Sequence, residues 1–185
     1  MKKPISKNAI IAIVLIFVLA VAFGVGLYLI LDFNKEFKEL YESEKIRIIS
    51  KDFVKDFSFD ELKELATPKT FTATYKPNQR LPITREYTGF CLLDIFSALD
   101  IELSKSKGVS FMPSDGRETV YNINDILTPN NVFIAFKWDG KAFPKGNAGI
   151  SPYPDENGGP FVVIRAKDLV STNRVKWLVQ IEVLF

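Results

Sequence analysis

A single run of 23 uncharged and almost wholly apolar residues divides this chain into two unequal parts. The run extends from Ala9 to Leu31, and a helix needs about 20 apolar residues to cross a hydrocarbon core. Three lysines lie before the run, and Asp32 is the first charged residue after it. Because basic residues tend to remain on the cytoplasmic side, we expect the N-terminus inside the cell and residues 32–185 outside. The sequence therefore predicts a single-pass protein of the cell membrane, inserted by one transmembrane helix.

The alternative is a secretory signal peptide that is cleaved. Ala20-Val21-Ala22 offers a small-x-small cleavage site. The apolar run continues for nine residues beyond Ala22, which favours an uncleaved signal anchor. The predicted organisation is a cytoplasmic tail (1–8), a transmembrane anchor (9–31), a helical stalk (32–45) and an extracytoplasmic domain (46–185).

Charge and cysteine content exclude several classes of protein. All 22 acidic residues and 21 of the 24 basic residues follow the apolar run, so the outer part carries a net charge of −1. A nucleic-acid-binding domain would need a concentrated basic surface, so we expect no nucleic-acid partner. Cys91 is the only cysteine, which excludes an internal disulfide framework. A segment of about 150 residues is large enough to be held together by its own core instead.

The outer part alternates between short strand and short helix patterns. Ser58 and Glu61 form a capping-box pattern at the start of one helix. The patterns predict strands at 46–49, 71–75, 109–112, 119–123, 132–138 and 161–165, helices at 59–65 and 92–99, and a last strand in which Val175, Trp177, Val179, Ile181 and Val183 share one face. Many short strands with a few short helices indicate an α+β domain built on a mixed β-sheet.

The last third of the chain carries a recognisable order of motifs. A turn at Trp138–Pro144 is followed by a long loop, Asn157-Gly158-Gly159-Pro160, a strand, and the segment Arg174–Val183 with its Val-Lys-Trp-Leu. This order resembles the end of the molybdopterin-binding domain of the sulfite oxidase family. Segments 59–65, 87–96 and 111–127 extend the resemblance over most of residues 46–185. The resemblance implies the fold of that oxidoreductase domain.

The resemblance also implies where a metal ligand would stand. In the family a cysteine thiolate, a soft ligand, binds molybdenum shortly before the motif that matches 87–96. The matching region here is 74–78, which contains no cysteine. We interpret Cys91 as a small buried hydrophobic residue. The sequence therefore predicts no metal ligand, and no cofactor is expected, although molybdopterin stays an alternative.

The candidate cofactor-binding residues implied by the resemblance are Asn157, Arg174 and Lys176. The family has a histidine where Asn157 stands and an arginine where Val162 stands. Lys176 is retained from the family's Val-Lys-Trp motif, and Arg174 precedes it by two residues. An isolated Lys-Trp pair near a chain end is more often structural. Phosphate binding by Arg174 and Lys176 would also lack the other cationic partners of the family's site.

Other catalytic sites find little support in the sequence. The chain has no histidine, which excludes Ser-His-Asp, Cys-His and His-metal sites. Neither a nucleophile elbow nor a phosphate-binding glycine loop is present, so we assign no catalytic residue. The loop 144–160 is long for a compact domain and carries Tyr153, which makes it a candidate binding region or else a surface excursion.

Two hypotheses follow. The first is a non-catalytic module that binds a small anionic or organic ligand, or a membrane or cell-surface protein, near Arg174, Lys176, Asn157 and the loop 144–160. The second is a divergent molybdopterin-dependent oxidoreductase subunit. The second requires a thiolate or a substitute side chain that faces the cofactor cleft.

Overall fold

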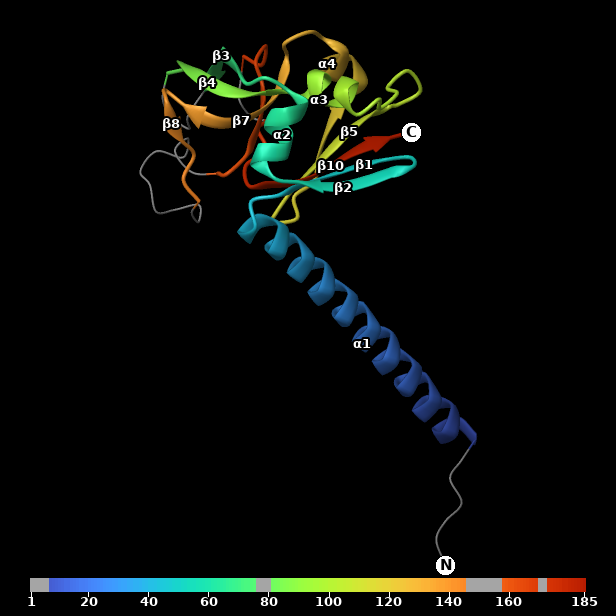
Figure 1. Ribbon diagram of the computed structural model, residues 1–185. Helices are drawn as coiled ribbons and strands as arrows, with labels where there is room; N and C mark the ends of the chain where they lie inside the picture. Colours follow the sequence, from blue (N-terminus) through green and yellow to red (C-terminus); the bar gives the residue numbers. More distant parts are fainter. Residues whose placement is uncertain (1–6, 76–80, 146–157, 170–172) are drawn as a thin grey trace, which may run out of the picture. The chain divides into compact units, whose positions relative to one another are not determined.

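The computed structural model describes residues 7–75, 81–145, 158–169 and 173–185 (Figure 1). The chain divides into two compact units, residues 1–36 and Phe37–Phe185. The second unit begins before residue 46, where we expected the outer domain to start. Its first residues are the last turns of a helix. They belong to this unit because Phe37 and Leu40 are buried against Val179.

Helix α1 (Lys7–Glu42) contains the whole apolar run and continues through the predicted stalk. In the part of the chain that the structure describes, no helix meets the length and apolarity that a membrane crossing requires. The single transmembrane helix expected over 9–31, and the membrane anchoring inferred from it, are therefore not supported by the described residues.

The first sheet of the domain has five strands in the order β2-β1-β10-β5-β6. Its strands are β1 (Ile46–Ser50), β2 (Phe53–Phe57), β5 (Gly108–Pro113), β6 (Thr119–Asn122) and β10 (Leu178–Leu184). β1 pairs in parallel with β10, whereas every other pair in this sheet is antiparallel. The sheet is therefore mixed, as the sequence predicted.

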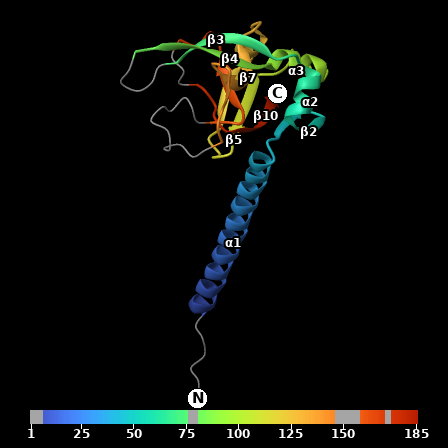
Figure 2. The same cartoon turned by 60° about the vertical axis from the view of Figure 1, so that its left-hand side comes forward.

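The second sheet is antiparallel and has the order β3-β4-β7-β8, with β9 also paired to β7. Its strands are β3 (Lys69–Tyr75), β4 (Ile83–Cys91), β7 (Val132–Trp138), β8 (Lys141–Ala142) and β9 (Val162–Arg165). The three short helices are α2 (Phe59–Leu65), α3 (Leu92–Ala98) and α4 (Ile123–Leu127). α3 contacts α2, β4 and β7, and α2 and α3 lie side by side in both views (Figures 1 and 2). The main core combines apolar side chains of both sheets and these helices.

The capping box at the start of α2 is confirmed. The backbone N–H of Glu61 donates to the Ser58 hydroxyl at 3.4 Å, and the Ser58 N–H donates to the Glu61 carboxylate at 2.9 Å. These bonds satisfy two donors that a helix start leaves without partners. The hydrogen bond from the Ser58 backbone and the neighbouring Lys55 lower the pKa of Glu61 to about 2. This helix presents Phe59 and Leu62 to the core.

The last strand differs from the predicted alternation. Trp177 has a positive φ of 54°, which ends the extended backbone before β10 begins at Leu178. The register with β5 also shifts between Leu178 and Gln180. Leu178 is therefore buried in the main core while Trp177 is only half-buried, and Val179 packs with Phe37 and Leu40 instead. The expected core face is correct for Ile181 and Val183. Single-residue backbone irregularities of this kind leave no trace in a period-2 pattern.

Candidate functional site

The two faces of the second sheet carry different chemistry. One face packs into the main core through Phe90, Ile134 and Val163. The other face carries a second cluster, built from Ala73, Tyr87, Ala135, Trp138, Phe143, Val162 and Ile164. The candidate residues from the sequence, Arg174 and Lys176, follow β9 of this sheet in the chain.

Arg174 lies on the face that carries Tyr87. Its guanidinium donates to the Tyr87 hydroxyl at 2.8 Å and to the carbonyl of Thr74 at 3.4 Å. It also lies 4.9 Å from the ring centroid of Tyr87 and 5.1 Å from that of Tyr75. A guanidinium over aromatic rings gains electrostatic energy from the ring quadrupoles. The cation predicted from the sequence is therefore held in place by two tyrosines.

A second guanidinium, which the sequence analysis missed, lies on the same face. Arg85 precedes Tyr87 by two residues on β4, and side chains two apart on a strand share a face. Its guanidinium lies 4.3 Å from the ring centroid of Trp138, the cross-strand partner of Tyr87, and contacts Asp139 at 3.3 Å. Among the described residues, the buried Arg85 Nε and Trp138 Nε1 find no hydrogen-bond partner. Buried donors without partners are unusual and point to a missing acceptor.

Lys176 lies beside the end of the long loop. A Cβ at Gly158 would come within 2.7 Å of the Lys176 Cβ and Cγ, so the lysine stem packs directly against this glycine. The N–H of Trp177 donates to the carbonyl of Gly158 at 2.6 Å, which ties the two segments together. Val175 forms a bridge with Val163, so Arg174 and Lys176 project to the same side of this segment. Asn157 and Tyr153 lie outside the described residues.

The positions that a molybdenum cofactor would need do not fit it. Tyr75 ends β3 and pairs with Ile83, whereas Cys91 lies eight residues farther along β4, roughly 25 Å away at about 3.3 Å per residue. Cys91 is buried, which confirms its interpretation as a small hydrophobic residue. Val162, at the family's arginine position, is buried in the second cluster. The described residues also contain no group of three or more carboxylate or cysteine side chains that could hold a metal. We derive no chemistry through this cofactor.

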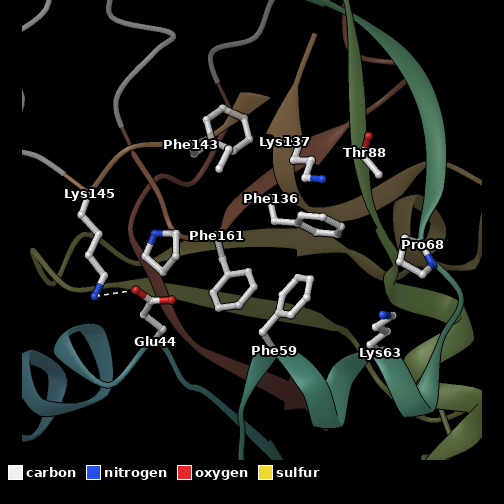
Figure 3. A pocket seen from close by; sticks show the side chains of 12 residues that line it. Glu44, Phe59, Lys63, Pro68, Thr88, Phe136, Lys137, Phe143, Lys145 and Phe161 are labelled. Atoms are coloured by element: carbon white, nitrogen blue, oxygen red, sulfur yellow. Dashed lines mark ion pairs between the residues drawn. The ribbon is translucent and has the colours of Figure 1, made fainter. Parts of the chain in front are cut away.

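The opposite face of the sheet borders a pocket of about 690 Å³ that the sequence analysis did not identify (Figure 3). Phe59, Phe136 and Phe161 gather in its middle. The rings of Phe59 and Phe136 meet edge to face at a centroid distance of 4.9 Å. Phe161 is almost fully buried, whereas Phe59 and Phe136 keep part of their surface exposed toward the pocket. The volume falls in the range of small-molecule sites.

A β-bulge in β7 shapes this pocket. Thr88 pairs with Lys137 and Gly89 pairs with Ala135, so Phe136 has no partner on β4. Two residues of the bulged strand then oppose one residue of its neighbour, which re-aims the side chains there. Phe136 and Lys137 both line the pocket as a result, and Trp138 turns to the Arg85 face. No signal in the sequence pattern predicts this bulge.

The charges of the pocket are distributed unevenly. On one side Lys145 forms an ion pair with Glu44 at 2.8 Å (Figure 3). On the other side lie Lys63, Lys137 and the Thr88 hydroxyl. Among the described residues, neither of these two lysines has a carboxylate within ion-pair distance. The pocket is therefore apolar in the middle and cationic at one edge.

Comparison with known proteins supports the fold alone. No family model and no curated protein matches the chain. Among solved structures, the sulfane dehydrogenase SoxCD from Paracoccus pantotrophus matches 78% of this chain with a TM-score of 0.57 and 14% sequence identity. The chain covers 39% of that protein chain. At this identity the match supports a distant fold similarity to a molybdopterin oxidoreductase, in agreement with the mixed α+β architecture expected from the sequence.

Proposed function

We propose that this domain is a non-catalytic binding module that holds a small anionic ligand on the face defined by Arg85, Arg174, Tyr87 and Trp138. The observation that carries the proposal is a pair of buried donors, Arg85 Nε and Trp138 Nε1, for which the described part of the chain offers no acceptor. The guanidinium of Arg174 lies on the same face, bonded to Tyr87. An anion is the acceptor that would satisfy these donors best, because hydrogen bonds between charged groups are the strongest ones.

The alternative, a divergent molybdopterin-dependent oxidoreductase, finds less support. It needs a thiolate or a substitute ligand near the end of β3, and the only cysteine is buried at the far end of β4. The distant similarity to SoxCD concerns the fold and carries no activity to this chain. An extracytoplasmic location of residues 32–185 is also part of the proposal, and what supports it is the distribution of lysines before the apolar run.

The deciding experiment is the molybdenum and pterin content of the full-length chain purified from its native host. Mass spectrometry measures the metal, and fluorescence after oxidation measures the pterin. We expect both to be far below one equivalent in protein that is well folded by circular dichroism. Stoichiometric molybdenum with pterin would overturn the proposal and establish an unrecognised ligand.

A second measurement addresses the anion directly. Inorganic phosphate and inorganic sulfate serve as probes, and the melting temperature of the full-length chain is followed as either is added. We expect a saturable rise that Arg85→Gln reduces, since a ligand that binds only the folded state stabilises it. Lys105→Gln, the same change of charge at an exposed lysine, is the control. Equal responses of both variants would place the anion elsewhere.

A further inference from the structure

The pocket around Phe59, Phe136 and Phe161 lies mainly on the opposite face of the second sheet from Arg85 and Arg174, and Phe143 of the second cluster also lines it. Neither Arg85 nor Arg174 lines the pocket, so it is a separate site. We propose that it binds a small aromatic carboxylate, with the ring among the three phenylalanines and the carboxylate at Lys63, Lys137 and Thr88. This inference goes beyond the anion site of the proposed function and does not depend on it.

The middle of the pocket suits a flat apolar group. Phe59 lies 4.9 Å from Phe136, edge to face, and 6.5 Å from Phe161, near parallel. Aromatic pairs prefer these offset and edge-to-face arrangements, and an additional ring can join them in the same geometry. Phe59 and Phe136 are only half-buried in the domain, so part of their apolar surface remains for a ligand to cover. Covering such surface removes apolar area from water, which favours binding.

The cationic edge selects the charge of the ligand. Thr88 and Lys137 are cross-strand partners, and residues that oppose each other across two strands have Cβ atoms about 5 Å apart. A carboxylate near this pair could accept a hydrogen bond from the hydroxyl and from the ammonium group at once. Lys63 reaches the same side from α2 (Figure 3). Lys145 contributes less, because Glu44 already neutralises it.

The bulge in β7 places the cationic edge of the pocket beside its apolar middle. A regular strand would turn Phe136 and Lys137 to opposite faces, whereas the bulge puts the apolar and the cationic group into one pocket. Gly89 makes the bulge sterically feasible, since a Cβ there would lie 2.6 Å from the carbonyl oxygen of Ile134. An aromatic body beside a single negative charge is the ligand chemistry that matches this arrangement.

Titration of the full-length chain with naphthalene-2-carboxylate tests the proposal, with isothermal calorimetry as the readout. We expect saturable binding of one molecule per chain. Naphthalene-2-methanol, which has the same ring and no charge, should bind several-fold more weakly. Lys63→Gln and Lys137→Gln should each weaken carboxylate binding about two- to fivefold, because exposed ion pairs contribute modestly. Lys105→Gln, at an exposed lysine that does not line the pocket, should leave the affinity unchanged.

Three results would overturn the inference. They are the absence of saturable binding, equal affinities for the acid and the alcohol, and equal affinities for the three lysine variants. Arg174→Met separates the two faces: if it abolishes binding while the lysine variants do not, the carboxylate occupies the anion site of the proposed function instead. If naphthalene-2-carboxylate does not bind to the pocket, the expected molybdenum and pterin contents of the chain stay the same. The two proposals can therefore be refuted independently.

Discussion

Replacing Tyr87 by Phe would remove one oxygen atom from the middle of the second sheet and leave the ring in place. Tyr87 is almost fully buried, and its hydroxyl accepts a hydrogen bond of 2.8 Å from the Arg174 guanidinium. Its ring stacks at 5.7 Å from Phe71 and at 6.3 Å from Phe143, and a phenylalanine would retain both contacts. The substitution therefore removes the hydrogen bond between the hydroxyl and the cation and keeps both ring contacts.

The expected loss of stability follows from the surroundings of the hydrogen bond between Tyr87 and Arg174. Hydrogen bonds that involve a charged group contribute about 1.5–3 kcal/mol to stability. Arg174 is half-buried and keeps its weaker contact of 3.4 Å with the Thr74 carbonyl, so we expect the lower end, about 1.5 kcal/mol. For a chain of this size that corresponds to a melting temperature lower by about 3–6 °C. Arg174→Met should cost more, about 2–3 kcal/mol, because it also removes the guanidinium from the rings of Tyr75 and Tyr87.

Urea unfolding of the full-length chain, followed by tryptophan fluorescence, measures both changes and the double variant. Because the two groups share one bond, the double variant should be more stable than additivity predicts, with a coupling of about 1 kcal/mol. Tyr28→Phe makes the same chemical change at an exposed position of α1 and should alter stability by less than about 0.5 kcal/mol. A coupling below about 0.3 kcal/mol would refute the argument that Tyr87 holds Arg174 in place.

Four further predictions follow from the described residues. Ser58→Ala should lower stability by about 1 kcal/mol in urea unfolding at neutral pH, since it removes the cap of α2. The pKa of Glu61 is lowered from 4.5 to about 2, so its stabilising effect is present above pH 4.5 and is lost as the pH falls toward 2. Glu61→Gln should therefore flatten the dependence of the unfolding free energy on pH in that window. An unchanged pH dependence would contradict this. Gly89→Ala should destabilise by about 3 kcal/mol, measured as the urea midpoint, because the new Cβ meets the Ile134 carbonyl at 2.6 Å and backbone cannot easily move aside. Cys91 should react with a thiol reagent such as dithionitrobenzoate only after unfolding, and rapid labelling of native protein would contradict its burial.

Elements with a local signal were predictable from the sequence. Helix α2 was found through its capping box, and β7 was found through its apolar run from Val132 to Trp138. Strands β2 and β4 were missed. After Ile83, β4 continues with Thr84, Arg85 and Glu86, whose polarity hides a strand that is exposed at one end and buried at the other. Period-based prediction works where one face of a strand is buried along its whole length.

The candidate site was only partly predictable for a related reason. Arg174 was found because a motif surrounds it, whereas Arg85 was missed because its role depends on Trp138, far along the chain. The pocket was missed entirely. Phe59 comes from a helix, Phe136 from a bulged strand and Phe161 from the position just before β9, and no spacing in the sequence relates them. Sites assembled from several elements become visible only once the pairing register is known.

The register of one strand pair explains why both sites exist in the same sheet. If β7 alternated regularly, Lys137 would turn toward Tyr87 and the guanidinium of Arg174, and Trp138 would turn into the pocket. A lysine at that point would add a like charge beside Arg85 and Arg174, and the pocket would lose its cationic edge to an indole ring. The extra residue in β7 turns Lys137 and Trp138 each to the opposite face of the sheet. The ring of Trp138 then supports Arg85 on one face, while Lys137 joins Thr88 on the other. The two candidate sites are therefore coupled through the backbone at Gly89, and a substitution that removes the bulge should disturb both.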